Sequence, residues 1–548
     1  MGSKESRRGC YLRYGRTRVS GLARTRERWI PAAAGVLLAL PFVLARYPPM
    51  GDLAFHEAAV SLLRHFGDPR FEPPGLYALN LGQPNQLFHL LAYVLSFVVS
   101  LDWACKLVVA GIVVGIAVAA GRLAAHLEVS PWGAVVVAPL ALGWMTRWGL
   151  VANLLGFAVL LASLPVLDRA AQAPTPRRAL ACVGLAGLLY LAHESSMLLF
   201  AIAGVLFAAR APRRVGPVAL SLSPTLGSVV LALVYHLRSG SLKAPSILAS
   251  SDIPVPVVRR IVDVPAALFS VGNTSVLMFV ASLAAVALLA VVPRVRVAAA
   301  EPRTVDVPWR FVALGAVSLA LYLVLPEALF GSTLIFERFL PLAFAVLVLT
   351  CLPRDLPSPR LAPLVVLLPL GMLAATRHLF VDADASNRDL DVVLAAMDDG
   401  AAVAQLDLTP RNPSVVAPVV GDAARALVDH GGRLLFSFTD APTYPVTIPA
   451  QLRWDEPVKR MVMTPFGFAP AYDLRRFRYV LVHTTSTRIA SLLPHAFAPE
   501  ARLVTQQGSW MLFESLLAIE SITSPDQPFP SPPPTPLAAR VKALLGTP

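Results

Sequence analysis

Long apolar stretches recur along the first two thirds of this sequence and constrain its fold more than any other feature. A helix rises about 1.5 Å per residue, so about 20 apolar residues cross a hydrocarbon core of about 30 Å. The runs cover residues 29–46, 87–101, 104–126, 132–145, 149–168, 179–193, 195–210, 217–236, 275–292, 310–326, 339–352 and 361–376. The chain is 56% hydrophobic and 15% charged, whereas soluble domains carry about 25% charged residues. The sequence therefore predicts a mostly α-helical, polytopic membrane protein.

The segment before the first run is strongly basic. Lysine and arginine recur from Lys4 to Arg28, and the whole chain carries a formal net charge of +13. A basic tail could bind nucleic acid, but one placed directly before an apolar run is typical of a signal that stays cytoplasmic. Without a clean cleavage site before Tyr47, we interpret residues 1–28 as a cytoplasmic tail and 29–46 as an uncleaved first span, with no nucleic-acid partner.

Clusters of arginine between the runs orient the spans. Four such loops, within 169–178, 210–214, 294–303 and 354–360, are each separated from the next by two runs. This alternation predicts a cytoplasmic N-terminus and a C-terminal part on the opposite side of the membrane. One early run must then fail to cross, and we expect a re-entrant segment at 132–145 beside eleven transmembrane helices. The rival interpretation is a single long helix over 179–210.

The predicted topology divides the chain into four parts. After the basic tail come a transmembrane domain (29–380) with a first outer loop at 47–86, an extracytoplasmic α/β domain (381–520) and a proline-rich tail (521–548). In the α/β domain, residues 401–408, 433–438, 479–484 and 510–515 are strand-like, whereas 387–397 and 422–429 are helix-like. Without a phosphate loop or metal motif, this domain is expected to act as a lid or to bind an acceptor.

The stretch "MGDLAFHEAA" places Asp52, His56 and Glu57 just after the first span. On a helix, Asp52 and His56 share one face, whereas Glu57 points about 100° away from His56. Asp52 could serve as a general base, or could hold a divalent cation together with the imidazole. The alternative is an interfacial amphipathic helix over 53–66 whose charges, Glu57 included, are solvated.

Further polar groups interrupt the later runs on the same predicted face. Glu337 and Arg338 head the run at 339–352, and an arginine fork suits a phosphate because it binds two oxygens at once. An interfacial Glu337–Arg338 pair that anchors the helix is the alternative. Lys243 and Arg147 are candidate helpers in binding phosphate, and His193 and Glu194 occupy the expected hairpin tip.

The order of these features resembles the bacterial GT-C-type membrane glycosyltransferases. The local matches are D-x-x-x-H at Asp52–His56, Pro84-Asn85, W-G-x-x-x-N from Trp148 to Asn153, His193 at the end of a span, and "RFLP" from Arg338. The resemblance implies a bacterial inner-membrane enzyme that moves a sugar from a polyprenyl-phosphate donor to an acceptor glycan, lipid or protein on the outer face. It also implies that Asp52 is the catalytic base or a metal ligand. Many such enzymes have paired acidic residues, whereas Leu53 follows Asp52 here.

Two other functions fit the same sequence. A transporter or flippase for a lipid-linked or anionic solute would also be polytopic, although such proteins tend to show internal repeats and ionisable groups near the midplane. A non-catalytic membrane assembly protein is the second alternative, because the usual second acidic residue is missing. The relative positions of Asp52 and Arg338 separate these alternatives from an enzyme.

Overall fold

The computed structural model describes most of the chain. It covers residues 27–209, 255–297, 308–328, 334–354, 358–409, 419–454, 461–519 and 535–545, together with Val458 and scattered residues between 219 and 237. Lys243, the basic tail up to residue 26 and most of the run at 217–236 lie outside the described residues.

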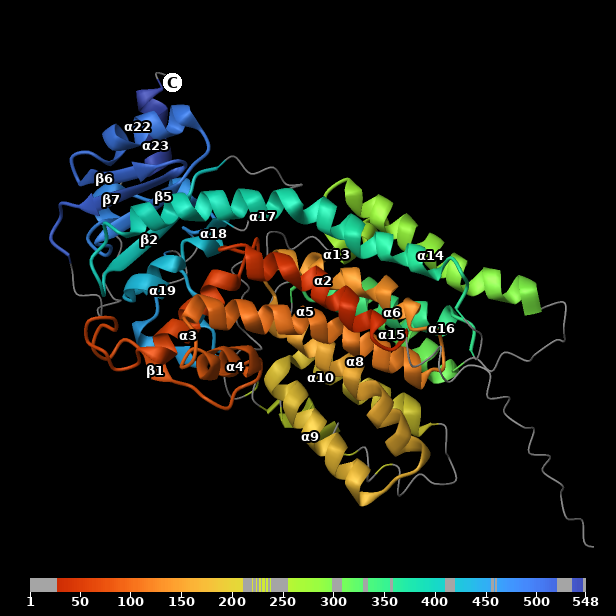
Figure 1. Ribbon diagram of the computed structural model, residues 1–548. Helices are drawn as coiled ribbons and strands as arrows, with labels where there is room; N and C mark the ends of the chain where they lie inside the picture. The colour runs from red at the N-terminus through yellow and green to blue at the C-terminus, as the bar shows by residue number, and fades with distance from the viewer. Residues whose placement is uncertain are drawn as a thin grey trace, which may run out of the picture.

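A bundle of long apolar helices forms the body of the molecule, and Figure 1 shows them running side by side. Its main helices are α2 (Ile30–Leu44), α5 (Leu101–His126), α8 (Val151–Gln172), α9 (Pro176–Ala192), α10 (Glu194–Ala208), α14 (Thr274–Val297), α15 (Trp309–Val324), α16 (Leu340–Cys351) and α17 (Leu367–Leu394). By length and composition, four segments of the described chain could cross a membrane: Leu101–His126, Val151–Gln172, Thr274–Val291 and Ala362–Leu394. The predicted mostly helical, multi-pass architecture is confirmed.

The segment predicted to be re-entrant runs the length of the bundle. It folds as α6 (Trp132–Val137), a 3-10 helix (Ala138–Leu142) and α7 (Trp144–Trp148). At one end, Ser130 is hydrogen bonded to Ser358, which in turn contacts Glu27 just before α2. At the other end, the Trp148 carbonyl accepts from the amide of Asp52, just after α2. The segment therefore lies alongside α2, and its re-entrant character stays a prediction.

The run predicted at 87–101 forms a helix that is too short to cross a bilayer by itself. Its helix, α4, covers only Leu87–Leu95. Nine residues span about 14 Å, less than half of a hydrocarbon core. The number of spans and their orientation therefore stay predictions. α9 and α10 are separate helices that meet at His193, as predicted.

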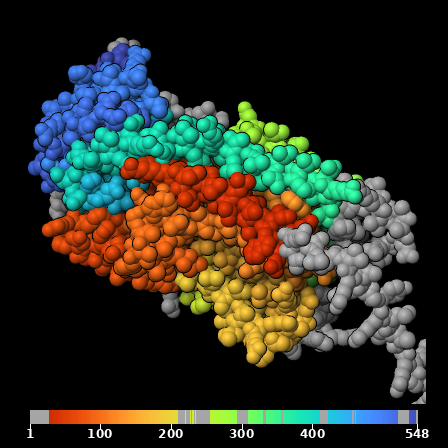
Figure 2. Space-filling model, in the orientation of Figure 1, coloured from red at the N-terminus to blue at the C-terminus, as the bar shows by residue number. Residues whose placement is uncertain are grey.

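The first outer loop packs beneath the C-terminal domain. It contains α3 (Leu53–Arg64) and a short strand β1 (Ala78–Leu79), and α4 follows it directly. Every residue of α3 from Leu53 to Leu63 is buried. The alternative of an interfacial helix with solvated charges is therefore wrong. In Figure 2 the blue C-terminal domain lies against the orange residues at this end of the bundle.

The C-terminal domain is built on a five-stranded sheet of order β3-β2-β5-β7-β6. The strands are β2 (Ala402–Asp407), β3 (Arg433–Leu434), β5 (Tyr479–His483), β6 (Ala501–Gln507) and β7 (Trp510–Ser515). β2 runs parallel to β3 and β5, whereas β7 is antiparallel to β5 and β6. The predicted strands are present, although the one at 433–438 shrinks to two residues. β6 was missed because its exposed sequence, ARLVTQQ, lacks a clear apolar face.

A single helix joins the bundle to this domain. The apolar run at 361–376 and the helix-like segment at 387–397 were expected to be separate, but α17 continues from Leu367 to Leu394. The intervening sequence, TRHLFVDADASN, contains neither glycine nor proline, so nothing in it ends a helix. In Figure 1, α17 runs along the bundle and ends at the sheet. The domain boundary predicted at residue 380 falls inside this helix.

Candidate functional site

Asp52 lies in the tight connection between α2 and α3, where the backbone fixes its position. Its amide donates to the Trp148 carbonyl at 3.0 Å, and Gly149 follows with a φ of 75°. A Cβ on Gly149 would lie 2.4 Å from the Asp52 nitrogen. Glycine is therefore required there, both for the left-handed backbone and for the close approach. The Asp52 side chain remains partly exposed.

Arg338 is the cation that acts on Asp52. It lies in the 3-10 turn Phe336–Phe339 at the head of α16, and its Nε donates to the Leu334 carbonyl at 3.1 Å. Burial raises the pKa of Asp52 to about 7, and the Arg338 charge opposes that rise. Asp52 and Arg338, 286 positions apart in sequence, therefore belong to one electrostatic cluster, as the predicted topology required.

His193 holds the Arg338 guanidinium. Arg338 Nη1 lies 3.1 Å from His193 Nε2, and a guanidinium can only donate, so Nε2 accepts. The other ring nitrogen, Nδ1, lies 2.8 Å from Ser195 Oγ and accepts from the Ser195 amide at 3.2 Å. Asn153 Nδ2 donates to the same hydroxyl at 2.9 Å. His193 and Asn153, both predicted to line the site, thus orient Arg338.

The other predicted residues have different relations to this cluster. Asn85 Oδ1 accepts from the Glu194 amide at 3.1 Å, which ties the first outer loop to the α9–α10 connection. The charges of Glu194 and Glu337 act on Arg338, and burial raises the pKa of Glu337 to about 7.

Arg147 and Trp148 border the cluster from α7. The carbonyls of both residues accept from the chain at Gly51 and Asp52, and the two side chains are partly exposed. Trp148 also packs against the apolar core of the bundle. Lys243, the remaining predicted helper, lies outside the described residues.

Glu57 departs from its prediction as a solvated neighbour. It is 5% exposed, and its Oε2 lies 3.7 Å from Nη1 of Arg425, a residue of the C-terminal domain. Burial and the nearby Asp102 raise the pKa of Glu57 to about 8. Glu57 therefore contributes to the junction between the first outer loop and the C-terminal domain.

His56 contacts two residues that sequence reasoning missed. Its Nδ1 lies 3.0 Å from His89 Nε2 and 3.4 Å from the Tyr444 hydroxyl. Burial and the neighbouring His89 lower the pKa of His56 well below its usual value. His89 was hidden inside a run that looked like a membrane span, and Tyr444 is 388 residues from His56.

The segment that carries Tyr444 is pinned to the first outer loop. Its strand β4 (Val446–Thr447) pairs antiparallel with β1. Asn80 Nδ2 donates to the carbonyls of Pro442 and Tyr444, at 2.7 and 2.9 Å. Gln86 Nε2 donates to the Thr443 carbonyl at 3.0 Å. The C-terminal domain thus supplies a side chain to the cluster and covers it.

The donor set near Asp52 does not suit a metal ion. Among the described residues, no three histidine, cysteine, aspartate or glutamate side chains are grouped so that they could hold one. The charged group that acts on Asp52 is instead Arg338, and the charges of Asp52 and Arg338 both act on the phenol of Tyr444.

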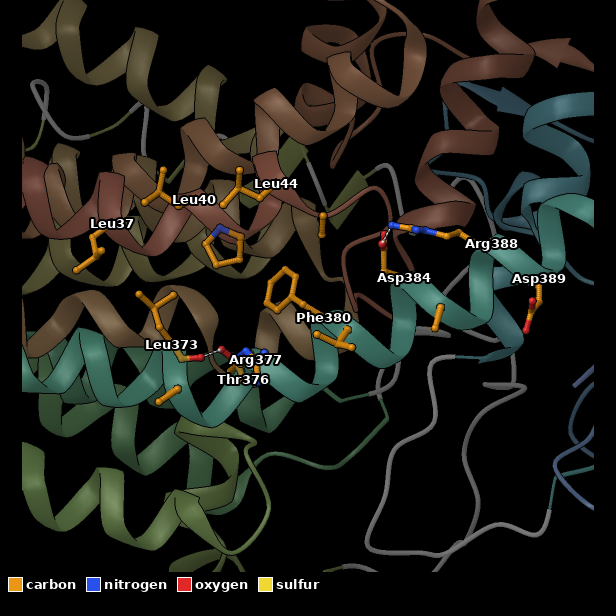
Figure 3. Close-up of a pocket in the computed structure, with 15 residues that line it drawn as sticks. Leu37, Leu40, Leu44, Leu373, Thr376, Arg377, Phe380, Asp384, Arg388 and Asp389 are labelled. Carbon is orange, nitrogen blue, oxygen red and sulfur yellow. Dashed lines mark hydrogen bonds and ion pairs between the residues drawn. The ribbon is translucent and has the colours of Figure 1, made fainter. Parts of the chain in front are cut away.

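A separate groove of about 940 Å³ lies between α2 and α17 (Figure 3). Leu37, Leu40 and Leu44 face it from α2, and Leu373 and Phe380 from α17. At one end, Arg388 pairs with Asp384. None of its lining residues belongs to the Asp52 cluster. Its apolar walls suit hydrocarbon better than a sugar phosphate.

Comparison with known proteins identifies the fold. No family model matches the chain, and no curated protein sequence does. A crystal structure of ArnT from Cupriavidus metallidurans bound to undecaprenyl phosphate covers 92% of this chain and 100% of its own, with a TM-score of 0.51 and 11% identity. The apo structure of the same protein covers 90% and 98%, with a TM-score of 0.52 and 11% identity. The chain has the ArnT fold.

The similarity to ArnT extends over nearly the whole of both chains, so it includes the helical bundle and the C-terminal domain together. The predicted resemblance to GT-C-type glycosyltransferases is thereby confirmed at the level of fold. At 11% identity, the roles of individual residues must be argued from this chain's own geometry.

Proposed function

We propose that this protein is a membrane glycosyltransferase that moves a sugar from a polyprenyl-phosphate donor to an acceptor on the extracytoplasmic face. The carrying observation is a partly exposed Asp52, with a pKa of about 7, within the field of Arg338. The ArnT fold supports a lipid-linked donor, since ArnT was crystallised with undecaprenyl phosphate. The location of the charged groups at one end of the bundle favours a transferase over a transporter.

Asp52 acts as the general base in this proposal. The acceptor hydroxyl oxygen attacks the anomeric carbon of the donor sugar while the bond from that carbon to the phosphate oxygen breaks. The acceptor proton passes to the Asp52 carboxylate, and the bonding pair leaves with the lipid phosphate. A positioned general base contributes about 10²–10⁴-fold to the rate, most efficiently when its pKa is near the working pH. The raised pKa of Asp52 meets that condition.

Arg338 binds the phosphate and stabilises the charge that develops as it leaves. His193 Nε2 accepts from the guanidinium on one side, at 3.1 Å, and the Leu334 carbonyl accepts from Nε. A guanidinium presents its N–H donors in a planar fork whose geometry matches the oxygens of a phosphate. Arg147 and Lys243 are proposed helpers in phosphate binding.

The test is the surface glycan or glycolipid profile of strains that carry single substitutions. Asp52→Asn and Arg338→Ala should both abolish the product that depends on this protein. Asp68→Asn is the matched control, because Asp68 lies in the same outer loop but bonds only locally to Arg70 in an exposed turn. If both site variants keep the wild-type profile at normal protein levels, the catalytic assignment is wrong.

A further inference from the structure

Two buried imidazoles beside Asp52 have hydrogen-bonding capacity that the proposed reaction does not use. His56 and His89 are 5% and 1% exposed, and their rings meet at 3.0 Å through His56 Nδ1 and His89 Nε2. His89 Nδ1 is a buried polar atom without a hydrogen-bond partner among the residues that the structure describes. Such atoms are costly to bury, so an unpaired one calls for an explanation.

The positions of the ring protons can be worked out from the contacts. Burial lowers the pKa of both histidines, that of His89 to about 3, so each ring is neutral and has a single N–H. The Gly149 backbone accepts from the His56 ring, and since Nδ1 faces His89, the proton is on Nε2. His56 Nδ1 is then an acceptor, and His89 Nε2 is the donor to it. His89 Nδ1 is left as an acceptor that lacks a donor.

Tyr444 supplies the complementary group. Its hydroxyl lies 3.4 Å from His56 Nδ1, but that single lone pair is already engaged by His89 at the shorter distance of 3.0 Å. Burial and the charge of Asp52 raise the pKa of Tyr444, so the phenol keeps its proton. Its O–H is therefore able to donate to a ligand.

The surroundings of these two groups suit a carbohydrate. The Tyr444 ring lies 5.0 Å from His89 and 5.0 Å from Phe438, centroid to centroid, and Phe88 lies 5.7 Å from His89. Aromatic faces can pack against the apolar face of a sugar ring. Tyr444 is also within the fields of both Asp52 and Arg338. A sugar whose phosphate binds Arg338 would thus lie beside Tyr444.

We propose that His89 Nδ1 and the Tyr444 hydroxyl form a subsite for one hydroxyl group of the donor sugar. A sugar hydroxyl donates one hydrogen bond and accepts others, so it satisfies the His89 acceptor and the Tyr444 donor at once. The proposal rests on the proposed glycosyltransferase function and deepens it. It makes the C-terminal domain, through Tyr444, part of the recognition of the sugar.

The experiment compares lipids with and without a sugar. The purified full chain in detergent is titrated with undecaprenyl phosphate and with undecaprenyl phosphate linked to a hexose or to a pentose. His89→Gln keeps an amide near the Nε2 position for His56 but removes the Nδ1 acceptor, and Tyr444→Phe removes only the hydroxyl. Each should weaken binding of the preferred sugar-linked lipid by about 2- to 10-fold and leave undecaprenyl phosphate binding unchanged.

Controls separate this proposal from the one on which it rests. His430→Gln should bind every lipid as wild type does, because His430 pairs with Asp399 at the domain surface. Thermal unfolding checks that each variant is folded. If His89→Gln does not fold, the binding measurements on Tyr444→Phe still test the proposed subsite. If wild type binds the sugar-linked lipid more tightly than undecaprenyl phosphate and neither variant changes this difference, the proposed subsite is wrong. The subsite is also wrong if wild type binds the two kinds of lipid equally well. Failure of wild type to bind any of these lipids would instead overturn the proposed function.

Discussion

At the scale of single residues, Asp52 determines how activity should depend on pH. A carboxylate can take up the acceptor proton only when it is ionised, and burial raises the pKa of Asp52 to about 7. We therefore expect the rate of sugar transfer to rise with pH through about 7 and to level off above it. A pH–rate profile of the purified protein checks this, and a midpoint near the ordinary value for aspartate would contradict it.

The substitution Arg338→Gln tests whether the charge of Arg338 acts on Asp52. The Arg338 charge lowers the pKa of Asp52, so its removal should raise that pKa further. The midpoint of the residual activity should then move to higher pH, in addition to an overall loss of rate. Arg64→Gln, at the exposed end of α3, is the control and should leave the midpoint in place. An unchanged midpoint in Arg338→Gln would show that the two side chains are not coupled.

Some residues of the site could be predicted and others could not, for a physical reason. Asp52, His193 and Arg338 interrupt apolar runs, and counting spans places them at the same end of the bundle. Tyr444 and His89 give no such signal, because their partners are fixed only by tertiary packing. Glu57 looked solvated because its partner, Arg425, belongs to a different domain.

At the scale of elements, the junction between α3 and α19 (Arg425–His430) depends on Arg425. This residue is 4% exposed, and its guanidinium lies 3.5 to 4.0 Å from carboxylates of Glu57, Asp102, Asp391 and Asp429. Arg425→Met leaves these acidic groups without their shared cation, which typically costs about 3–5 kcal/mol for buried pairs. We expect a large fall in the melting temperature, measured by thermal unfolding in detergent.

The control for Arg425→Met is Arg388→Met. Arg388 pairs with Asp384 on α17, but its side chain is 64% exposed, and exposed pairs contribute only about 0–1 kcal/mol. The melting temperature of the Arg388→Met variant should therefore stay close to that of wild type. Equal effects of the two substitutions would show that Arg425 is not the centre of the junction.

Glu57 makes the same junction sensitive to pH. Its folded-state pKa of about 8 is above the ordinary value for glutamate, so its contribution is fully present at low pH and is lost as pH rises through about 8. The wild-type melting temperature should fall as pH rises from about 4.5 to about 8, and Glu57→Gln should reduce this fall. If the melting temperatures of wild type and Glu57→Gln depend on pH in the same way, Glu57 is not the group that makes the junction sensitive to pH.

Gly149 links the end of α7 to the position of Asp52. An alanine there would be strained by the φ of 75°, and its Cβ would lie 2.4 Å from the Asp52 nitrogen. Gly149→Ala should therefore reduce both stability and transfer. Gly75 has the same φ of 75°, and a Cβ there would point into open space. Gly75→Ala should therefore show only the loss of stability that comes from an alanine in the left-handed backbone conformation. If the two variants behave alike, the contact with Asp52 does not matter.

At the scale of elements, two apolar runs show how far hydrophobicity indicates burial. In the run at 87–101, only one face of α4 packs on α3, α5, α8 and α9. Leu91, Val94, Phe97 and Val98 of the same run remain exposed. The run at 132–145, expected to be re-entrant, continues through a 3-10 helix and a break at Gly143 to Trp148. Hydrophobicity therefore indicated burial at 132–145 but not along the whole of 87–101, because the neighbouring helices cover only one face of α4.

At the scale of the whole molecule, the arginine loops predict which side of the membrane the site faces. The site lies at the end of the bundle covered by the C-terminal domain, and the predicted orientation places that end outside the cytoplasm. Alkaline phosphatase fused after residue 519 should therefore be active, and the same fusion after residue 173, in the predicted cytoplasmic loop, should be inactive. The reverse pattern would place the site in the cytoplasm.

The central claim is that Asp52 performs chemistry on a lipid-linked sugar, and the most direct measurement separates binding from turnover. Wild type and Asp52→Asn are each incubated with undecaprenyl phosphate-linked sugars and cell-envelope acceptors, and the release of undecaprenyl phosphate is followed. We predict that Asp52→Asn binds the donor as wild type does but releases undecaprenyl phosphate about 10²–10⁴-fold more slowly. Release at the wild-type rate by Asp52→Asn would contradict the account.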